Sequence, residues 1–278
     1  MPRQLEQYQI IERSLIKKYR KEIWNPFIAG VKRYELVNEG DKIAVCISGG
    51  KDSWIMANLM RHLQRISDTN FELVYLCMDP GYKEVNRKKI EDNAKLMNID
   101  LTVYNSDIFD AVNTMDGSPC YMCARMRRGH LYAKAKELGC NKIALGHHFD
   151  DVIETTLMGM MYGAQIQGML PKLHSTNFEG MELIRPLYCV HEDAIIAWKN
   201  YNNLEFIQCA CRFVENRDAS EDGIGESKRQ EIKFLIRDLK KINPLVDSNI
   251  FNSIHAVNVD TMPGYKMNGK EYSFLDNF

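Results

Sequence analysis

Short apolar segments alternate with helical patterns along residues 42–161, and this alternation limits the possible folds more than any other feature of the sequence. The apolar segments are residues 42–47, 71–78, 101–104 and 142–145. Helical patterns occupy residues 52–64, 84–97, 123–138 and 150–161. Strands that alternate with helices build βαβ units, so the sequence predicts an α/β fold around a doubly wound parallel sheet. Ligands of such sheets bind at the carboxyl ends of the strands.

The parts of the chain on either side follow a different pattern. Residues 5–35 have the mixed amphipathic character of one or two helices, and residues 163–180 are expected to form a loop. Beyond Arg185 we expect a helix over 192–201, a second helix over 227–241 and an irregular tail. The predicted organisation is therefore an N-terminal helical segment, a central domain and a C-terminal helical segment with a tail, at residues 1–36, 37–215 and 216–278.

The composition is that of a soluble globular protein, with 45% hydrophobic and 26% charged residues in 278. No apolar run reaches the roughly 20 residues that a membrane span needs. The N-terminus lacks the apolar core of a secretion signal, so we expect a cytoplasmic protein without membrane contact. A net charge of −1 neither requires nor excludes a nucleic-acid partner. Basic residues that could form a local RNA-binding face, or only solvate helices, are Lys17, Lys18, Arg20, Lys21, Lys32, Arg33, Arg125, Arg127 and Arg128.

The segment Ser48-Gly49-Gly50-Lys51-Asp52-Ser53 joins the first predicted strand to the following helix. Glycines let the backbone approach an anion, and a helix N-terminus offers it unpaired N–H groups. Lys51 adds a cation, and Asp52 suits such a site if Mg²⁺ accompanies the phosphates. A Walker A loop would need Ser or Thr after the lysine. The hexapeptide closely resembles instead the PP-loop of the N-type ATP pyrophosphatases, which implies cleavage of ATP to pyrophosphate and transfer of AMP to a carbonyl oxygen.

The eight cysteines are expected to be thiols, metal ligands or catalytic groups in a reducing compartment. Four of them lie in or beside apolar segments and are predicted to be small buried hydrophobes: Cys46, Cys77, Cys140 and Cys189. The other four cluster by spacing: Cys120, Cys123, Cys209 and Cys211. A Cys-x-x-Cys pair taken alone suggests zinc more often than an iron–sulfur cluster, with a redox pair as a third alternative.

Longer motifs surround these cysteines. They are Pro119-Cys120-x-x-Cys123-x-Arg125-x-Arg127-Arg128-Gly129, Leu145-Gly146-His147-His148-x-Asp150-Asp151, Gly40-Asp41-Lys42-Ile43-x-Val45-Cys46, Gly168-Met169-x-Pro171-Lys172-Leu173 and Ile184-Arg185-Pro186-Leu187. Together with the PP-loop they resemble the tRNA 2-thiocytidine synthetase (TtcA-like) family of PP-loop ATP pyrophosphatases. The resemblance covers about residues 10–212.

The resemblance implies an adenine nucleotide alpha hydrolase-like PP-loop domain and a 4Fe–4S cluster held by three cysteines. Its fourth iron would be open to hydrosulfide. Cys120 and Cys123 are two of the implied ligands. The family carries the third ligand in a downstream Cys-x-x-Cys, whereas this chain has Cys209-Ala210-Cys211. Cys209 aligns with the ligand, and Cys211 is the alternative.

The predicted ATP-binding residues come from the PP-loop and the second motif: Ser48, Gly49, Gly50, Lys51, Asp52, Ser53, Gly146, His147 and Asp151. Catalytic roles at the phosphates are assigned to Lys51 and Asp52. Asp150 and Asp151 could instead cap the following helix. His147 and His148 belong to a nucleotide pocket or to simple packing. Arg127 and Arg128 are expected to contact phosphate of ATP or tRNA, unless they only solvate a helix.

The function that the resemblance implies is ATP-dependent, iron–sulfur-dependent tRNA thiolation by a sulfurtransferase that releases AMP and pyrophosphate. It would adenylate a pyrimidine carbonyl, with cytidine C2 in the anticodon loop as the expected position, and replace its oxygen with sulfur. The expected partners are tRNA, ATP and a sulfur donor, either sulfide or a cysteine-desulfurase type of protein; a homodimer is left open. Two alternatives are another PP-loop enzyme with a different substrate, which iron content would separate, and a non-catalytic zinc protein, which pyrophosphate release would separate.

Overall fold

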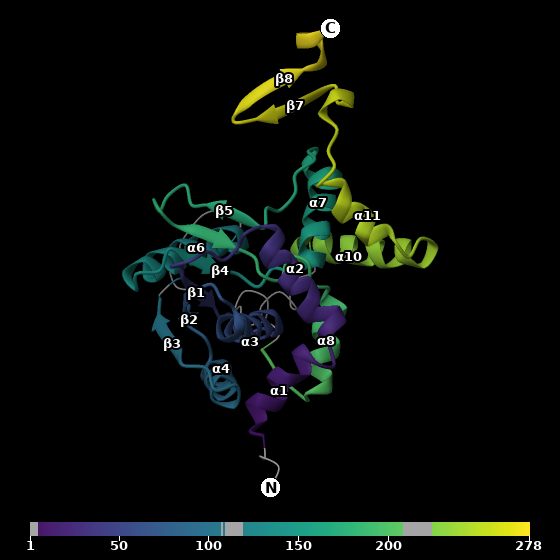
Figure 1. The fold of residues 1–278 in the computed structure, drawn as a ribbon. Helices are drawn as coiled ribbons and strands as arrows, with labels where there is room; N and C mark the ends of the chain where they lie inside the picture. The colour runs from purple at the N-terminus through teal and green to yellow at the C-terminus, as the bar shows by residue number, and fades with distance from the viewer. Residues whose placement is uncertain (1–4, 107, 109–118, 208–223) are drawn as a thin grey trace. The chain divides into compact units, whose positions relative to one another are not determined.

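The computed structural model describes residues 5–106, 108, 119–207 and 224–278 (Figure 1). Its chain divides into two compact units. The first, here called the sheet unit, comprises Met1–Asp151 and Leu170–Gly225. The second, the C-terminal unit, comprises Val152–Met169 and Glu226–Phe278. In the described residues no helix is both long and apolar enough to span a membrane.

The sheet unit is built on six strands in the order β3-β2-β1-β4-β6-β5. They are β1 Lys42–Cys46, β2 Glu72–Asp79, β3 Leu101–Asn105, β4 Lys142–Ala144, β5 Lys172–His174 and β6 Glu182–Ile184. All neighbouring strands pair in parallel except β5 and β6, which pair antiparallel. The predicted doubly wound parallel sheet is confirmed. The expectation of a loop over 163–180 was wrong in part, because β5 lies within it and is too short to give a periodic signal.

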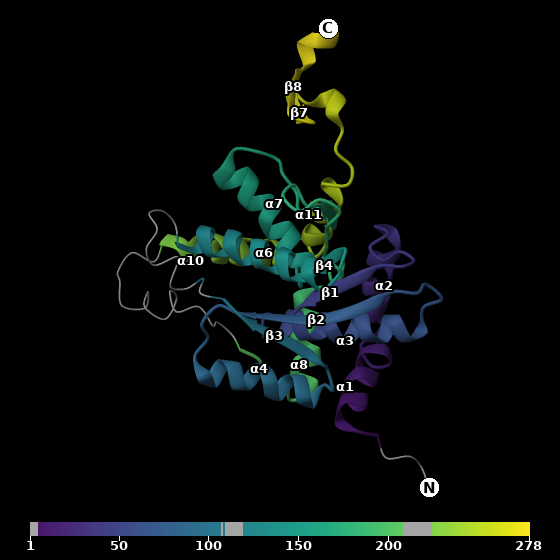
Figure 2. The ribbon, with the colours of Figure 1, turned by 90° about the vertical axis from the view of Figure 1, so that its left-hand side faces the viewer.

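The predicted helices are present, each within a few residues of its expected bounds. They are α1 Gln7–Ile16, η1 Arg20–Trp24, α2 Asn25–Arg33, α3 Lys51–Ile66, α4 Glu84–Leu96, α6 Pro119–Glu137, α7 Phe149–Gly163 and α8 Glu192–Tyr201. The N-terminal helical segment contains a π-helical turn, η1, between its two α-helices. Figure 2 shows α6 on one side of the sheet and α3, α4 and α8 on the other.

Side chains of β1 alternate between two hydrophobic cores, one on each face of the sheet. Ile43 and Val45 belong to the larger core, which also contains buried residues of α1, α2, α3 and α8. Ala44 and Cys46 belong to a smaller core with Tyr132 of α6. Successive side chains of a strand point to opposite faces, so a central strand that is apolar throughout is covered on both sides.

A buried lysine links the amino ends of three strands. Lys142, which is 2% exposed, begins β4. Its ammonium lies 2.6 Å from a carboxylate oxygen of Asp41, just before β1, and 3.3 Å from one of Glu182 in β6. It also donates to the Leu36 carbonyl at 3.2 Å. A buried ammonium surrounded by these acceptors is electrically compensated, as buried charges must be.

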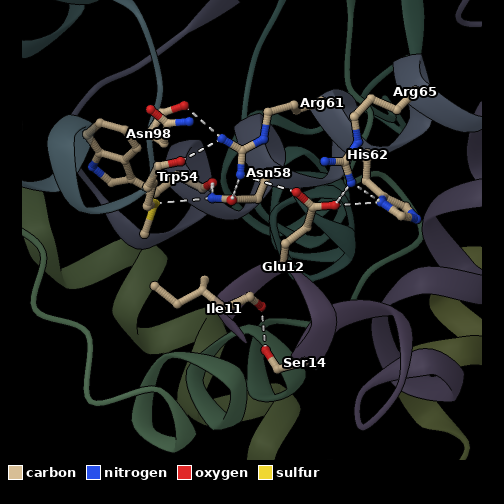
Figure 3. Close-up of polar contacts among 10 residues, drawn as sticks. Ile11, Glu12, Ser14, Trp54, Asn58, Arg61, His62, Arg65 and Asn98 are labelled. Carbon is tan, nitrogen blue, oxygen red and sulfur yellow. Dashed lines mark hydrogen bonds and ion pairs between the residues drawn. The ribbon is translucent and has the colours of Figure 1, made fainter. Parts of the chain in front are cut away.

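A buried carboxylate joins the N-terminal helix to α3 (Figure 3). Glu12 of α1 lies 2.6 Å from His62 Nδ1 and 3.4 Å from an Arg61 nitrogen, and it also pairs with Arg65. Burial alone would raise the pKa of Glu12, but the His62 hydrogen bond and the arginine charges outweigh it and lower that pKa. The interaction therefore stabilises the folded chain most when Glu12 is ionised.

The C-terminal unit contains more regular structure than the sequence predicted. Its elements are α10 Ile224–Ile242, α11 Val246–Ser253, η2 Val259–Thr261, β7 Gly264–Met267, β8 Lys270–Ser273 and η3 Phe274–Asn277. The expected helix over 227–241 is present as α10. The expected irregular tail was wrong, because β7 and β8 form an antiparallel hairpin. Asn268 and Gly269 make its turn with φ of 53° and 76°, which is the conformation that Asn-Gly favours.

Candidate functional site

The PP-loop connects β1 to α3 at the carboxyl edge of the sheet. Gly49 has φ of 89°, in the left-handed region that favours glycine. Helix α3 begins at Lys51, directly after Gly50. Ser53 Oγ donates to the Gly50 carbonyl at 2.8 Å and lies 3.3 Å from Ser48 Oγ, so the two hydroxyls hold the turn. The first-turn amides of α3 are thereby directed at the space over the loop, as in anion-binding helix termini.

Gly146 lies against the backbone of this loop. A Cβ at this position would lie 3.1 Å from the Asp52 carbonyl carbon and 3.2 Å from the Ser53 nitrogen. Both contacts are with main-chain atoms, so only glycine lets the segment after β4 approach so closely. Strands β1 and β4 are neighbours at the point where the strand order reverses, which is where ligands of doubly wound sheets bind.

Lys51 and Asp52 are paired with each other and with a residue that the sequence did not single out. The Lys51 ammonium lies 3.2 Å from Asp52 and 3.0 Å from Glu192, the first residue of α8. Burial would lower the pKa of Lys51, but the two carboxylates outweigh it and raise that pKa. Asp52 Oδ1 is buried and accepts no hydrogen bond from the described residues. His148 Nε2 lies 3.9 Å from Asp52 Oδ1.

The two histidines after β4 have different surroundings. His147 lines the cavity above the PP-loop, whereas His148 is buried. Asp151 is the third residue of α7, so it is not the N-cap; its Oδ2 accepts from the His148 backbone N–H at 3.0 Å, and His148 Nδ1 accepts from the Asp151 backbone N–H at 3.4 Å. Asp150 caps a different helix: its Oδ2 accepts from the Glu192 N–H at 2.7 Å. Contact of Asp151 with a nucleotide stays a prediction.

A cavity of about 360 Å³ collects most of these groups, and we call it the ATP-loop cavity. Ser48, Asp52, Ser53, Gly146 and His147 line it from the strand ends, and Arg127 and Arg128 line it from α6. Five of the nine predicted ATP-binding residues therefore share one cavity with the two predicted phosphate-contacting arginines. Gly50 and Lys51 line a separate pocket instead, and Gly49 and Asp151 line neither.

A tyrosine that sequence reasoning missed links the two walls. Tyr82 Oη accepts a hydrogen bond from Arg127 at 3.2 Å and donates to the Ser48 carbonyl at 3.5 Å. Burial raises the pKa of Tyr82 to about 12, so it stays protonated at neutral pH. It follows the turn at Asp79, whose carboxylate accepts from the Gly81 and Tyr82 N–H groups. That turn was the only local signal that could have pointed to it.

The isolated cysteines are packing residues. Cys46, Cys77 and Cys140 are buried, as predicted, whereas Cys189 is only partly buried. Cys46 lines the ATP-loop cavity. Its pKa is raised to about 12 by burial and by the neighbouring thiols of Cys140 and Cys77. It therefore presents no thiolate at neutral pH.

The clustered cysteines can be placed only by the described segments next to them. Cys120 and Cys123 lie three residues apart in the sequence of α6, and Cys123 precedes Arg127 by four residues. Cys209 and Cys211 lie outside the described residues. The last residue described before them, Ile207, donates its backbone N–H to the Gly49 carbonyl at 3.3 Å. The chain therefore leaves the PP-loop two residues before Cys209.

Comparison with known proteins identifies the family. A PP-loop domain model matches residues 13–211. The tRNA-cytidine(32) 2-sulfurtransferase of Citrifermentans bemidjiense is 32% identical over 231 residues, which are 82% of this chain and 87% of that protein. The enzyme of the same name from Delftia acidovorans is 34% identical over 259 residues, 91% of this chain and 78% of that one. The chain belongs to the tRNA-cytidine(32) 2-sulfurtransferase family of PP-loop proteins. The resemblance seen in the sequence is thus confirmed.

A solved structure supports the fold of this family member. The U34-tRNA thiolase NcsA from Methanococcus maripaludis, solved with its [4Fe-4S] cluster, matches with a TM-score of 0.66 and 20% identity, over 88% of this chain and 81% of that one. At this identity the likeness establishes the PP-loop fold, in agreement with the strand order above. The roles of the individual site residues stay predictions.

Proposed function

We propose that this protein uses ATP to adenylate the C2 carbonyl of a cytidine in the anticodon loop of tRNA and then replaces the carbonyl oxygen with sulfur. Family membership supports the reaction type, and the relatives' name supports cytidine as the base. The observation that carries the proposal is the shared cavity: the PP-loop forms one wall, and the turn of α6 that follows Cys123 forms the other.

The PP-loop has the chemistry of an ATP phosphate site. The α3 N-terminus and the serine hydroxyls supply donors, and Lys51 supplies a cation that can leave Glu192 for a phosphate. Asp52 Oδ1 is buried beside the cavity and makes no hydrogen bond to any residue that the structure describes, so it fits a ligand of Mg²⁺ or of one of its waters. Mg²⁺ bound there would neutralise phosphate charge and favour departure of pyrophosphate.

The proposed reaction has two displacements. The base oxygen attacks the α-phosphorus of ATP, the bond to the β-phosphate oxygen breaks, and pyrophosphate leaves. Sulfide then attacks C2, the C2–O bond breaks, and the oxygen departs with AMP. Arg127 and Arg128 line the cavity from the wall opposite the PP-loop and are suited to stabilise the charge on the phosphates. Tyr82 holds Arg127 in this orientation.

The cysteines fit an iron–sulfur cluster with three protein ligands. Cys120 and Cys123 are one turn apart on α6, and Cys209 follows a segment bonded to the PP-loop. Three thiolates suit a 4Fe–4S cluster with one open iron, and such a cluster would supply bound sulfide as the nucleophile. Cys211 remains the alternative third ligand. The sulfur would come from sulfide or a cysteine-desulfurase type of donor.

The test is a reconstituted reaction. The anaerobically purified protein is incubated with ATP, Mg²⁺, sulfide and an unmodified tRNA transcript. Nucleotide products and tRNA nucleosides are then quantified. We expect AMP, pyrophosphate and 2-thiocytidine in equal amounts, and iron in the protein. ADP as the main product, or zinc without iron, would contradict the proposal.

A further inference from the structure

A second cavity lies next to the ATP-loop cavity. Its volume is about 610 Å³, and Arg128 lines both. We call it the Arg185 cavity. Its walls come from α6, from the connection between β5 and β6, and from Arg185 just after β6. No residue of the PP-loop lines it, so it is not an extension of the phosphate site.

Arg185 is a buried cation that forms no ion pair with any described residue. Only 9% of the residue is exposed. One terminal nitrogen donates to the Leu170 carbonyl, but Nε is buried and donates to no described residue. Within the described chain Arg185 makes no ion pair, whereas the equally buried Lys142 contacts two carboxylates. A buried charge without a counterion destabilises the folded protein, and a bound ligand of opposite charge would offset this effect.

The electrostatics of the cavity favour an anion. Burial and the charge of Arg128 outweigh the opposing effect of the Asp151 carboxylate, which lies beyond ion-pair distance, and lower the pKa of Arg185 to about 10. Arg185 therefore remains cationic at neutral pH in the field of another cation. Arg125 also lines the cavity. Three guanidinium groups around one space are the arrangement that binds phosphate by paired N–H donors.

The remaining wall is apolar and aromatic. Tyr132 and Phe178 stack with ring centroids 5.2 Å apart and an angle of 15° between their planes. Both line the cavity, and its volume is in the range of small-molecule sites, roughly 300–1,000 Å³. Inorganic phosphate would need no such wall. A nucleotide, which joins a phosphate to a flat apolar base, matches both parts of the cavity.

We propose that the Arg185 cavity binds a nucleotide of the tRNA adjacent to the reacting cytidine. Arg185 and Arg128 would contact its phosphate, and the aromatic pair would face its base or ribose. Arg128, common to both cavities, would lie at the phosphodiester between the two nucleotides. This inference rests on the proposed function, since it assumes that a tRNA base enters the ATP-loop cavity.

The test measures binding of an unmodified tRNA transcript at several salt concentrations. Arg185→Met is expected to weaken RNA binding about tenfold and to reduce the salt dependence by about one phosphate contact, with ATP affinity unchanged. Arg185→Lys, which keeps the charge, is expected to retain most of the salt dependence. Arg13→Met, at an exposed position of α1, is the control for loss of one positive charge and is expected to bind like wild type.

Thermal unfolding separates a structural role from a binding role. Because Arg185 has no carboxylate partner in the described chain, Arg185→Met is expected to unfold at or near the wild-type temperature. Unchanged RNA affinity in Arg185→Met would overturn the inference. A loss of affinity for ATP or pyrophosphate in Arg185→Met, with RNA binding unchanged, would also overturn the inference, since the Arg185 cavity would then bind the phosphates of ATP. A wild-type protein that bound no tRNA would contradict the proposed function itself.

Discussion

Ile207 donates its backbone N–H to the Gly49 carbonyl at 3.3 Å, and its side chain occupies the space beside Gly49. A Cβ on Gly49 would lie 2.4 Å from Ile207 Cδ1 and 2.9 Å from Ile90 Cγ1. The PP-loop is therefore packed directly against the segment that leads to Cys209. The conformation of the phosphate loop therefore depends on a contact with the last residue described before Cys209.

Gly49→Ala is expected to destabilise the protein and to abolish ATP binding. The left-handed φ alone costs about 1–2 kcal/mol for a residue with a Cβ, and the overlap with Ile207 adds about 1–3 kcal/mol. Urea unfolding and ATP titration would measure the two effects.

The control for this substitution is Gly40→Ala. Gly40 has a similar φ of 77°, but a Cβ there meets no atom within 4 Å, so only the backbone cost applies. Ile207→Ala in the Gly49→Ala background is expected to recover part of the lost stability. If Gly49→Ala and Gly40→Ala lowered the free energy of unfolding equally, the contact with Ile207 would not contribute to the destabilisation.

Lys51→Ala and Asp52→Ala are expected to lower the rate of adenylation by about 100-fold or more, because both groups act on charge at the phosphates. The fold and the iron content should be retained, since Asp52 lines the ATP-loop cavity, Lys51 lines a separate pocket, and neither belongs to a hydrophobic core. Pyrophosphate release measures the loss. Lys95→Ala, exposed on α4, is the matched control and should react like wild type. Near-normal turnover of a folded variant would remove the role of that residue.

Cys120→Ala, Cys123→Ala and Cys209→Ala are each expected to lose the cluster and thiolation while ATP still binds at the PP-loop. Cys211→Ala should retain iron, because a fourth thiolate would occupy the iron position that sulfide needs. Cys189→Ala, partly buried away from the pair, is the control. Anaerobic iron analysis and electron paramagnetic resonance distinguish the variants. Iron lost in Cys211→Ala and kept in Cys209→Ala would reverse the choice of ligand.

Glu12→Gln is expected to lower the free energy of unfolding at neutral pH by about 3 kcal/mol. This value is at the low end of the range for breaking a buried ion pair, because the Arg65 side chain is 53% exposed. Since folding lowers the pKa of Glu12, its contribution is complete above the ordinary value of 4.5 and is lost as the pH falls through the folded value. The difference between wild type and variant should therefore shrink below about pH 4.5.

Chemical denaturation at several pH values measures this difference. Glu22→Gln, exposed in η1, is the control and should leave the pH profile unchanged. A constant difference between wild type and Glu12→Gln down to pH 3 would mean that the carboxylate charge is not what stabilises the α1–α3 contact.

Local signals in the sequence were sufficient for the sheet and for the PP-loop. The strand–glycine–helix pattern around Gly49 and Gly50 is contiguous, so one segment carries the whole signal. The hairpin at Asn268 and Gly269 also had a local signal, the Asn-Gly pair, which the expectation of an irregular tail overlooked. Strand β5 has three residues and gave none.

Other parts of the site arise only from tertiary contact. Glu192 lies 141 positions from Lys51 in the chain, and nothing around it marks it as the lysine's partner. The close approach of Gly146 to the PP-loop backbone depends on β1 and β4 being neighbours. Arg185 belongs to a motif recognised in the sequence. Its possible role in anion binding becomes visible only from its burial and from the absence of an ion pair with any described residue.

The ion pairs of Lys142 have a consequence for the pairing of the central strands. Because β1 and β4 are apolar on both faces, a slip of one residue would exchange one apolar face for another at little hydrophobic cost. The same slip would move the buried ammonium away from Asp41 and Glu182 and leave it without either counterion. Loss of both counterions would destabilise the shifted pairing by several kcal/mol, so Lys142 favours the observed register of the central strands. Any slip would also carry Gly146 past the PP-loop, so the geometry of the proposed ATP site depends on a charge at the opposite end of the sheet.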